Sequence, residues 1–208
     1  MTTLLICSPA PGDGKTTVAA GLARALALMG SRVIAVDCDL RKPRLNAEFD
    51  VELAEGLGDV LVEIREPLNV LKTTSDPGVR VMTAGALPFT PSSLVVSMQR
   101  LPAVLEVLRE DADYLVIDTP PISAAAEASE IAAAADGVIL VINAREARRD
   151  VLAAAREQLS QARARLAGVV MNRADSPLIG YEYYGYRPVE PGANGEVGNP
   201  PDRQRSGL

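Results

Sequence analysis

The chain has 208 residues, of which 48% are hydrophobic and 23% are charged. A chain of this length forms one domain and buries roughly 70% of its unfolded surface. Its composition excludes a fully disordered, collagen-like or disulfide-framework protein. With 27 acidic and 21 basic residues the net charge is −6, which argues against broad, sequence-blind binding to nucleic acid. The sequence contains no histidine, so histidine triads, histidine-ligated zinc and histidine general bases are excluded.

Three features bear on where the protein works. The only cysteines, Cys7 and Cys38, lie in apolar stretches, which favours a reduced, intracellular setting over a disulfide framework. The first residues show no charged region before their short apolar run, so we predict no signal peptide. The sequence has no apolar run of about 18 residues, so we expect no membrane span.

Short apolar runs alternate with longer segments of helical period. The runs are rich in Val, Ile and Leu and hardly alternate with polar residues, as expected of parallel strands covered on both faces. The predicted strands are Thr3–Cys7, Arg32–Asp37, Val79–Thr83, Tyr114–Asp118, Gly137–Asn143 and Gly168–Asn172.

Apolar residues at helical spacing mark two helices. The first helix, which Gly30 ends, has an apolar face predicted at Val18, Leu22, Ala25, Leu26 and Met29. The second has one at Val151, Ala155, Leu159, Ala162 and Leu166. Thr90-Pro91 predicts a further helix start, because threonine can cap a helix and proline fits its first turn.

This alternation predicts an α/β fold of the P-loop NTPase type, with a doubly wound, mainly parallel sheet. Ligands of such sheets bind at the carboxyl ends of the strands. We expect one P-loop domain over residues 1–180 and a tyrosine cluster at 181–186. Residues 187–208 contain four prolines and four glycines and are predicted to be a disordered tail.

The first strand leads into a glycine-rich loop and a helix. Glycine lets backbone N–H groups turn toward an anion, and a helix N-terminus attracts it. Lys15 supplies a positive charge for the β- and γ-phosphates and Thr16 a hydroxyl for Mg²⁺, as in the Walker A motif. Pro9 stands where that motif has its first glycine. The predicted nucleotide-binding residues here are Pro11, Gly12, Asp13, Gly14, Lys15, Thr16 and Thr17.

Two further strands end in aspartates: Asp37 and Asp39 follow the second strand, and Asp118 follows the fourth. Carboxylates beside a P-loop can hold Mg²⁺ directly or through water. We expect Asp37 and Asp39, which are two residues apart, to have different tasks. We predict Lys15, Asp37, Asp39 and Asp118 as catalytic residues, and Thr16, Asp39 and Asp118 as metal ligands. Which of Asp37 and Asp39 is the base stays open.

The segments P-G-D-G-K-T-T, V-D-C-D-L-R-K-P and V-I-D-T-P-P together resemble the bacterial tyrosine kinase, or BY-kinase, family. The likeness extends over nearly all of residues 4–186, including Gly56–Leu61, which is similar to a helix start of that family. It implies ATP and Mg²⁺ as cofactors. It also implies a nucleotide contact at Asn172 and Arg173, where an asparagine amide can bond adenine; a strand-ending turn is the alternative reading.

Four of the five tyrosines lie between residues 181 and 186. This cluster resembles the family's autophosphorylation segment, which makes Tyr181, Tyr183, Tyr184 and Tyr186 the predicted phosphoacceptors. The ten residues from Asn172 to Tyr181 span up to ~33 Å when extended, enough to reach a neighbouring copy. An aromatic docking patch without chemistry is the alternative.

The resemblance further implies a role in the polymerisation or export of capsular or exopolysaccharide. It implies a membrane-spanning activator, fused or separate, a homo-oligomer, and a tyrosine phosphatase as antagonist, with the protein at the inner face of the plasma membrane. The family's Glu-x-x-Arg-x-x-Arg helix does not occur in this sequence, so the chain is either part of a longer protein or assembles differently. The family's Pro-Asn-Pro-x-Glu segment reads Phe89-Thr-Pro-Ser-Ser93 here.

Two rival functions remain. A partition or cell-division ATPase switch shares the sheet and the paired aspartates, but it places a second lysine where this chain has Ala10, and it lacks a tyrosine cluster. A non-catalytic nucleotide-binding module would dock through its tyrosines without phosphorylating them.

Overall fold

The computed structural model describes residues 2–123, 128, 131–132 and 135–174. Six strands follow the six predicted apolar runs to within two residues at either end. They are β1 (Thr2–Cys7), β2 (Val33–Asp37), β4 (Val79–Met82), β5 (Tyr114–Asp118), β6 (Gly137–Asn143) and β7 (Leu166–Asn172). Sequence reasoning missed the two-residue strand β3 (Lys72–Thr73), which is too short to show a pattern.

The described strands form one sheet in the order β3-β4-β2-β5-β1-β6-β7. Strand β3 runs antiparallel to β4, and all other neighbours are parallel. The predicted mainly parallel, doubly wound sheet is therefore confirmed. Strand β1 lies between β5 and β6, where the strand order changes direction, and this is where such sheets bind ligands.

Helices alternate with the strands, as the sequence predicts. They are α1 (Lys15–Leu28), α2 (Leu45–Glu48), α3 (Leu57–Leu61), the 3₁₀ turn η1 (Pro67–Val70), α4 (Pro91–Met98), α5 (Leu101–Glu110) and α7 (Arg149–Gln161). The predicted cap is present, because the Thr90 hydroxyl accepts a hydrogen bond from the Ser93 N–H at 3.2 Å. Gly30 follows the end of α1 with a φ of 90°, a conformation that favours glycine.

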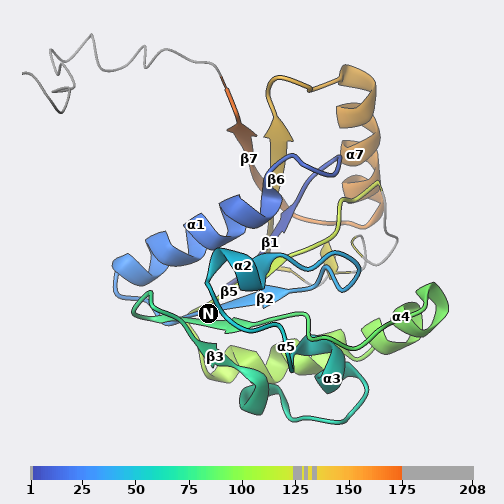
Figure 1. The fold of residues 1–208 in the computed structure, drawn as a ribbon. Coiled ribbons are helices and arrows are strands. Elements are labelled where there is room, and N and C mark those ends of the chain that lie inside the picture. Colours follow the sequence, from blue (N-terminus) through green and yellow to red (C-terminus); the bar gives the residue numbers. More distant parts are fainter. Residues whose placement is uncertain (1, 124–127, 129–130, 133–134, 175–208) are drawn as a thin grey trace, which may run out of the picture. The chain divides into compact units, whose positions relative to one another are not determined.

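The sheet is buried on both faces, which explains why its strands do not alternate. Ile34 and Val36 of β2 pack on one side with α3, α4 and α5. Val33 and Ala35 of the same strand pack on the other side with α1 and Phe49. Figure 1 shows α1 and α5 on opposite sides of the sheet.

The predicted apolar face of α1 was partly wrong. Ala19, Ala20, Ala23 and Leu26 are buried against the sheet, whereas Met29 is 74% exposed. The prediction is confirmed for Leu26, and Val18 and Leu22 are partly buried against the same core. It is wrong for Ala25 and Met29, which are exposed. Alanines complete the buried face, and their small side chains let the helix lie close to the strands.

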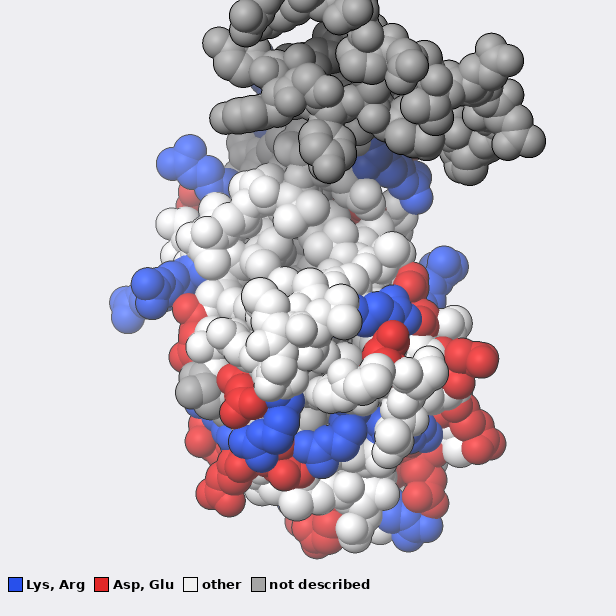
Figure 2. Space-filling model, turned by 90° about the vertical axis from the view of Figure 1, so that its left-hand side faces the viewer, with Lys and Arg blue, Asp and Glu red and all other residues white. Residues whose placement is uncertain are grey.

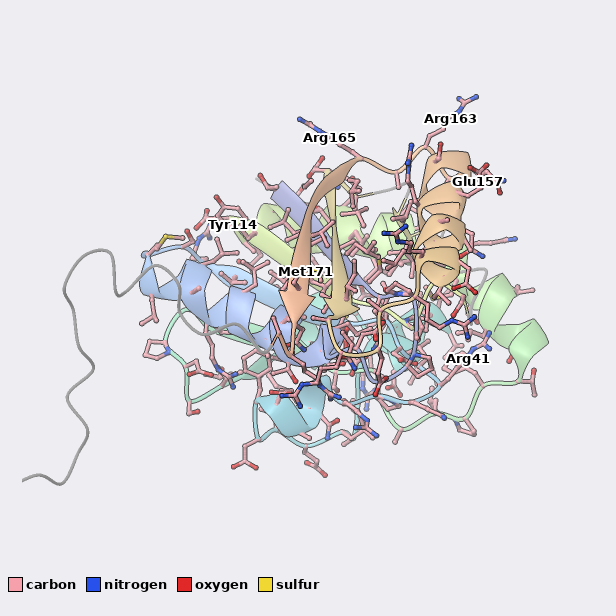
Figure 3. All side chains as sticks on the ribbon, turned by 90° about the horizontal axis from the view of Figure 1, so that it is seen from above. Arg41, Tyr114, Glu157, Arg163, Arg165 and Met171 are labelled. Carbon is pink, nitrogen blue, oxygen red and sulfur yellow. The ribbon has the colours of Figure 1, made fainter. Side chains whose placement is uncertain are left out.

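Strand β7 also differs from expectation, because it is an edge strand. Its Leu166, Val169 and Met171 are between 45% and 55% exposed, and Figure 3 shows Met171 on this strand. Helix α7 ends at Gln161, so Leu166 belongs to β7 rather than to the helix, while Ala155 and Leu159 are buried as predicted. Among the described residues, none of the helices combines the length and apolar character needed to cross a bilayer.

Candidate functional site

The loop between β1 and α1 turns back on itself at two glycines. Gly12 has a φ of 87° and Gly14, which precedes the first residue of α1, has a φ of 93°. L-residues with side chains rarely adopt these angles. A Cβ on Gly14 would lie 2.1 Å from the Asn172 side-chain nitrogen. The loop therefore needs glycine at position 14 for both backbone conformation and space.

Short polar side chains stabilise this loop by hydrogen bonds to its backbone. The Asp13 carboxylate accepts a hydrogen bond from the Ala10 N–H at 2.9 Å, and the Ser8 hydroxyl donates to the Ala10 carbonyl at 2.8 Å. From a distant loop, the Ser123 hydroxyl donates to the Pro9 carbonyl at 2.6 Å. Asp13 is only 6% exposed, so its carboxylate stabilises the turn. Sequence reasoning missed both serines, although Ser8 stands directly before the loop.

Lys15 brings two of the predicted aspartates together. Its ammonium nitrogen lies 3.3 Å from Asp39 Oδ2 and 3.5 Å from Asp118 Oδ1. It also lies 3.4 Å from the hydroxyl of Thr16. The three charged side chains are at most 12% exposed, so the interactions are little screened by solvent. A single cation thus balances two carboxylates at the start of α1.

The Asp118 carboxylate is paired with Lys15 but accepts no hydrogen bond of normal geometry. Both oxygens are buried and neither accepts a hydrogen bond from a described residue. Burial raises the pKa of Asp118 to about 6, and the neighbouring charge of Lys15 opposes this rise. A buried acceptor without a donor usually has a functional reason. A cation or its water shell would satisfy these oxygens.

The donor set fits Mg²⁺, which prefers oxygen ligands and keeps several waters. The Thr16 hydroxyl and the Asp118 carboxylate supply such oxygens, and the Asp39 carboxylate contacts the same lysine. No three acidic or cysteine side chains of the described residues form a metal cage by themselves. At a P-loop, nucleotide phosphates and water supply the remaining ligands.

Asp37 has a different environment from Asp39. It ends β2 directly opposite Asp118 in the register, and it is fully buried. Its Oδ1 accepts the Asp39 N–H at 3.0 Å, and its Oδ2 accepts the N–H groups of Arg44 and Leu45 at 3.1 and 3.0 Å. Burial and the negative charge of Asp118 raise the pKa of Asp37 to about 7, although the N–H groups lower it. Its carboxylate holds the loop that leads to α2.

Asp39 lies beyond the strand, because β2 ends at Asp37. The loop after β2, and not the strand, therefore sets the direction of the Asp39 side chain, and the two aspartates have different partners, as the expectation of different tasks requires. The Asp39 Oδ1 accepts the Lys42 N–H at 3.1 Å, while Oδ2 faces Lys15. Of the two, only Asp39 is in contact with the P-loop lysine.

The neighbouring threonines differ in exposure. Thr16 is 8% exposed, beside Lys15, as expected for a metal ligand. Thr17 is exposed, and its hydroxyl donates to a Glu48 carboxylate oxygen at 2.8 Å, which ties α1 to α2.

Asn172, at the end of β7, contacts the P-loop across 159 residues of sequence. Its side-chain nitrogen donates to the Asp13 carbonyl at 2.9 Å, and its side-chain oxygen accepts the Arg173 N–H at 2.9 Å. The amide thus supports the loop, and the adenine contact stays a prediction. The predicted phosphoacceptors, Tyr181, Tyr183, Tyr184 and Tyr186, lie outside the described residues, as do the domain boundary at 180 and the predicted tail.

A shallow hollow elsewhere on the surface contains none of the predicted site residues. It lies between α3, η1 and α5 and is lined by residues such as Val60, Arg100 and Val104. The charged groups that converge at the carboxyl edge of the sheet are therefore the candidate site.

Comparisons with known proteins agree with this geometry. Residues 4–184 match the CobQ/CobB/MinD/ParA nucleotide binding domain. The chain is similar to tyrosine-protein kinase YwqD of Bacillus subtilis (strain 168), with 34% identity over 186 residues, 89% of this chain and 78% of that protein.

Two solved structures show the same fold. The VpsO kinase domain matches with a TM-score of 0.77 and 30% sequence identity. The match covers 84% of this chain and 85% of the VpsO kinase domain chain. The septum site-determining protein MinD from Pyrococcus horikoshii, solved with Mg-ADP, matches with a TM-score of 0.71 and 26% sequence identity. The match covers 87% of this chain and 76% of the MinD chain.

Proposed function

The chain belongs to the CobQ/CobB/MinD/ParA nucleotide-binding family and, within it, to the bacterial tyrosine kinases, and from this premise we propose that it transfers the γ-phosphoryl group of ATP to its own C-terminal tyrosines. The observation that carries the proposal is the Lys15 ammonium, which lies between Asp39 and Asp118 at the start of α1. This arrangement suits phosphoryl transfer, where catalysis is mostly positioning and charge stabilisation.

The P-loop would bind the phosphates of ATP. Its backbone N–H groups between Pro11 and Thr17 surround the N-terminus of α1, and Lys15 adds a positive charge. Thr16 and Asp118 would hold Mg²⁺, with Asp39 nearby. Bound Mg²⁺ would neutralise charge on the β- and γ-phosphates. Asn172 and Arg173 would border the adenine.

We assign the general base to Asp39 rather than to Asp37. Asp37 has both oxygens occupied by backbone N–H groups and is fully buried, so a tyrosine hydroxyl would not reach it. Asp39 has one oxygen directed at Lys15 and keeps some exposure. It would take the phenol proton as the new bond forms between the tyrosine oxygen and the γ-phosphorus. The bond to the β-phosphate oxygen breaks, and ADP leaves.

The acceptors would be Tyr181, Tyr183, Tyr184 and Tyr186, supplied by a neighbouring copy in a homo-oligomer. Each phosphate adds about −1.5 to −2 charge, which would weaken contacts between copies. The physiological setting we propose is capsular or exopolysaccharide synthesis at the inner face of the plasma membrane. There a membrane-spanning activator would recruit the protein and a tyrosine phosphatase would reverse the modification.

The experiment uses the full chain with Mg-ATP labelled in the γ-phosphate, at concentrations where copies meet. Mass spectrometry should find phosphate on the tyrosine cluster. Lys15→Met should abolish the label, whereas Arg156→Gln, an exposed position on α7, should retain it. An ATPase switch like MinD would instead release inorganic phosphate and leave all four tyrosines unlabelled, and that outcome would refute the proposal.

A further inference from the structure

Exposed basic side chains stand on both sides of the P-loop. Lys42 and Arg44 lie on the loop after β2, and Arg149 begins α7, which follows β6. All three are exposed. Because the carboxyl ends of parallel strands meet at one edge of a sheet, these residues flank the nucleotide site. We call Lys42, Arg44 and Arg149 the basic rim.

The backbone of two residues of the basic rim is anchored to Asp39 and Asp37. The Lys42 N–H donates to Asp39 Oδ1 and the Arg44 N–H donates to Asp37 Oδ2, each at 3.1 Å. Their side chains therefore leave a backbone that is held in place by the site itself. A ligand bound to them would be positioned relative to the transferring phosphoryl group.

Arginines elsewhere in the described structure are commonly ion-paired. Examples are the contacts of Arg24 with Asp76 at 2.8 Å and of Arg80 with Asp111 at 2.6 Å. Figure 2 shows acidic and basic side chains interspersed on one face. Within the part of the chain that the structure describes, no ion pair involves the basic rim. Although the net charge of the chain is −6, no carboxylate of the described residues neutralises these cations at the place where phosphates react.

The chemistry of the basic rim matches the proposed acceptor. Ammonium and guanidinium groups form short, charge-assisted hydrogen bonds with phosphate. Strands β2 and β6 are three strand spacings apart, about 14 Å, and the extended segment from Tyr181 to Tyr186 spans about 17 Å. A phosphotyrosine at one side of the P-loop can therefore lie on the basic rim while another tyrosine occupies the site.

We propose that the basic rim binds the phosphate of an already phosphorylated tyrosine in the acceptor segment and so promotes transfer to the next tyrosine. This inference rests on the proposed function and adds to it a rule of recognition. The first phosphorylation would make the segment a better substrate, until the accumulated charge drives the copies apart.

The test compares two fluorescent peptides with the sequence of residues 176–187, one unmodified and one phosphorylated at Tyr186. Polarisation with the full chain measures their binding without requiring catalysis. We expect the phosphopeptide to bind about fivefold more tightly at low salt, and the difference to shrink at about 0.5 M salt. Its KM as a substrate should fall by a similar factor.

The variant Lys42→Gln/Arg44→Gln should lose the preference for the phosphopeptide. The control Arg156→Gln/Arg165→Gln removes the same charge and should keep it. Figure 3 shows Arg165 and Arg163 at the far end of β7 from Met171, away from Arg41 on the loop after β2. Equal binding of the two peptides to the unmutated chain, or equal loss in both variants, would overturn the inference.

A second measurement separates peptide recognition from nucleotide binding. The Kd for Mg-ATP should change less than twofold in Lys42→Gln/Arg44→Gln. A loss of ATP affinity as large as the loss of phosphopeptide affinity would assign these side chains to the nucleotide and refute the inference. If the chain transfers no phosphate but still prefers the phosphopeptide through Lys42 and Arg44, the rim is supported and only the proposed function fails.

Discussion

Gly14→Ala tests how the far end of the sheet supports the P-loop. Gly14 has a φ of 93°, and an added Cβ would lie 2.1 Å from the Asn172 side-chain nitrogen. Gly12 is the matched control, because its φ is 87° and nothing lies within 4 Å of an added Cβ. The two substitutions share the backbone strain and differ in the contact with Asn172.

The expected costs follow from these two terms. Forcing alanine into the left-handed region costs about 1–2 kcal/mol, which is the whole expected loss for Gly12→Ala. In Gly14→Ala the Asn172 amide must also move, which breaks its hydrogen bond to the Asp13 carbonyl and costs about 1 kcal/mol more. We therefore expect a loss of about 2–3 kcal/mol for Gly14→Ala.

Urea unfolding of both variants, each with and without Asn172→Ala, measures these terms. Once Asn172 is truncated, the two glycine substitutions should cost the same within about 0.5 kcal/mol. The affinity for Mg-ATP should also fall more in Gly14→Ala than in Gly12→Ala. If the two glycine variants lose equal stability while Asn172 is present, the contact between β7 and the P-loop contributes nothing and our reasoning is wrong.

Three further predictions concern stability. Asp37→Asn should lower the free energy of unfolding by about 2–4 kcal/mol, because an amide cannot accept all three N–H groups. Asp39→Asn should change it by less than about 1 kcal/mol. If urea unfolding shows similar losses of stability for both variants, the different roles of the two aspartates are contradicted. The pKa of Asp118 is raised from 3.8 to about 6, so between these values the folded chain binds more protons than the unfolded chain and its stability falls as the pH rises. The free energy of unfolding of Asp118→Asn, relative to that of the unmutated chain, should therefore increase between about pH 4 and 7. A difference that does not change with pH would count against the raised pKa. Gly21→Ala should raise the melting temperature, because Gly21 lies in the exposed middle of α1 with nothing within 4 Å of an added Cβ and alanine gains about 0.5–1 kcal/mol in helix propensity. Gly56→Ala should lower the melting temperature, because its Cβ would lie 2.1 Å from a backbone oxygen.

Local patterns were sufficient to predict the six longer strands and the P-loop. A buried parallel strand is an apolar run in any surroundings, so β5 and β6 were predicted to the residue. The P-loop glycines and Lys15 could be read from the sequence, because their backbone angles and charge follow from residue type. The cap at Thr90 was equally local, since its partner is three residues away.

The sequence predicted less accurately which residues are buried where burial depends on neighbouring helices and strands. Three of the buried residues of α1 are alanines, because the helix lies close to the sheet, whereas hydropathy alone favours larger residues such as Met29. The exposed face of β7 results from its place at the sheet edge, which no feature within residues 166–172 reveals.

The sequence by itself determined that a nucleotide site exists, because the phosphate-binding loop is a contiguous segment whose residue types dictate its backbone and charge. Only the tertiary structure decided how the aspartates divide their work. The sequence predicted different tasks for Asp37 and Asp39 but did not say which task belongs to which residue. In the structure Asp37 accepts backbone N–H groups, whereas Asp39 contacts Lys15. The support that Asn172 lends to the P-loop likewise arises only when parallel strands bring residues 159 positions apart to one edge.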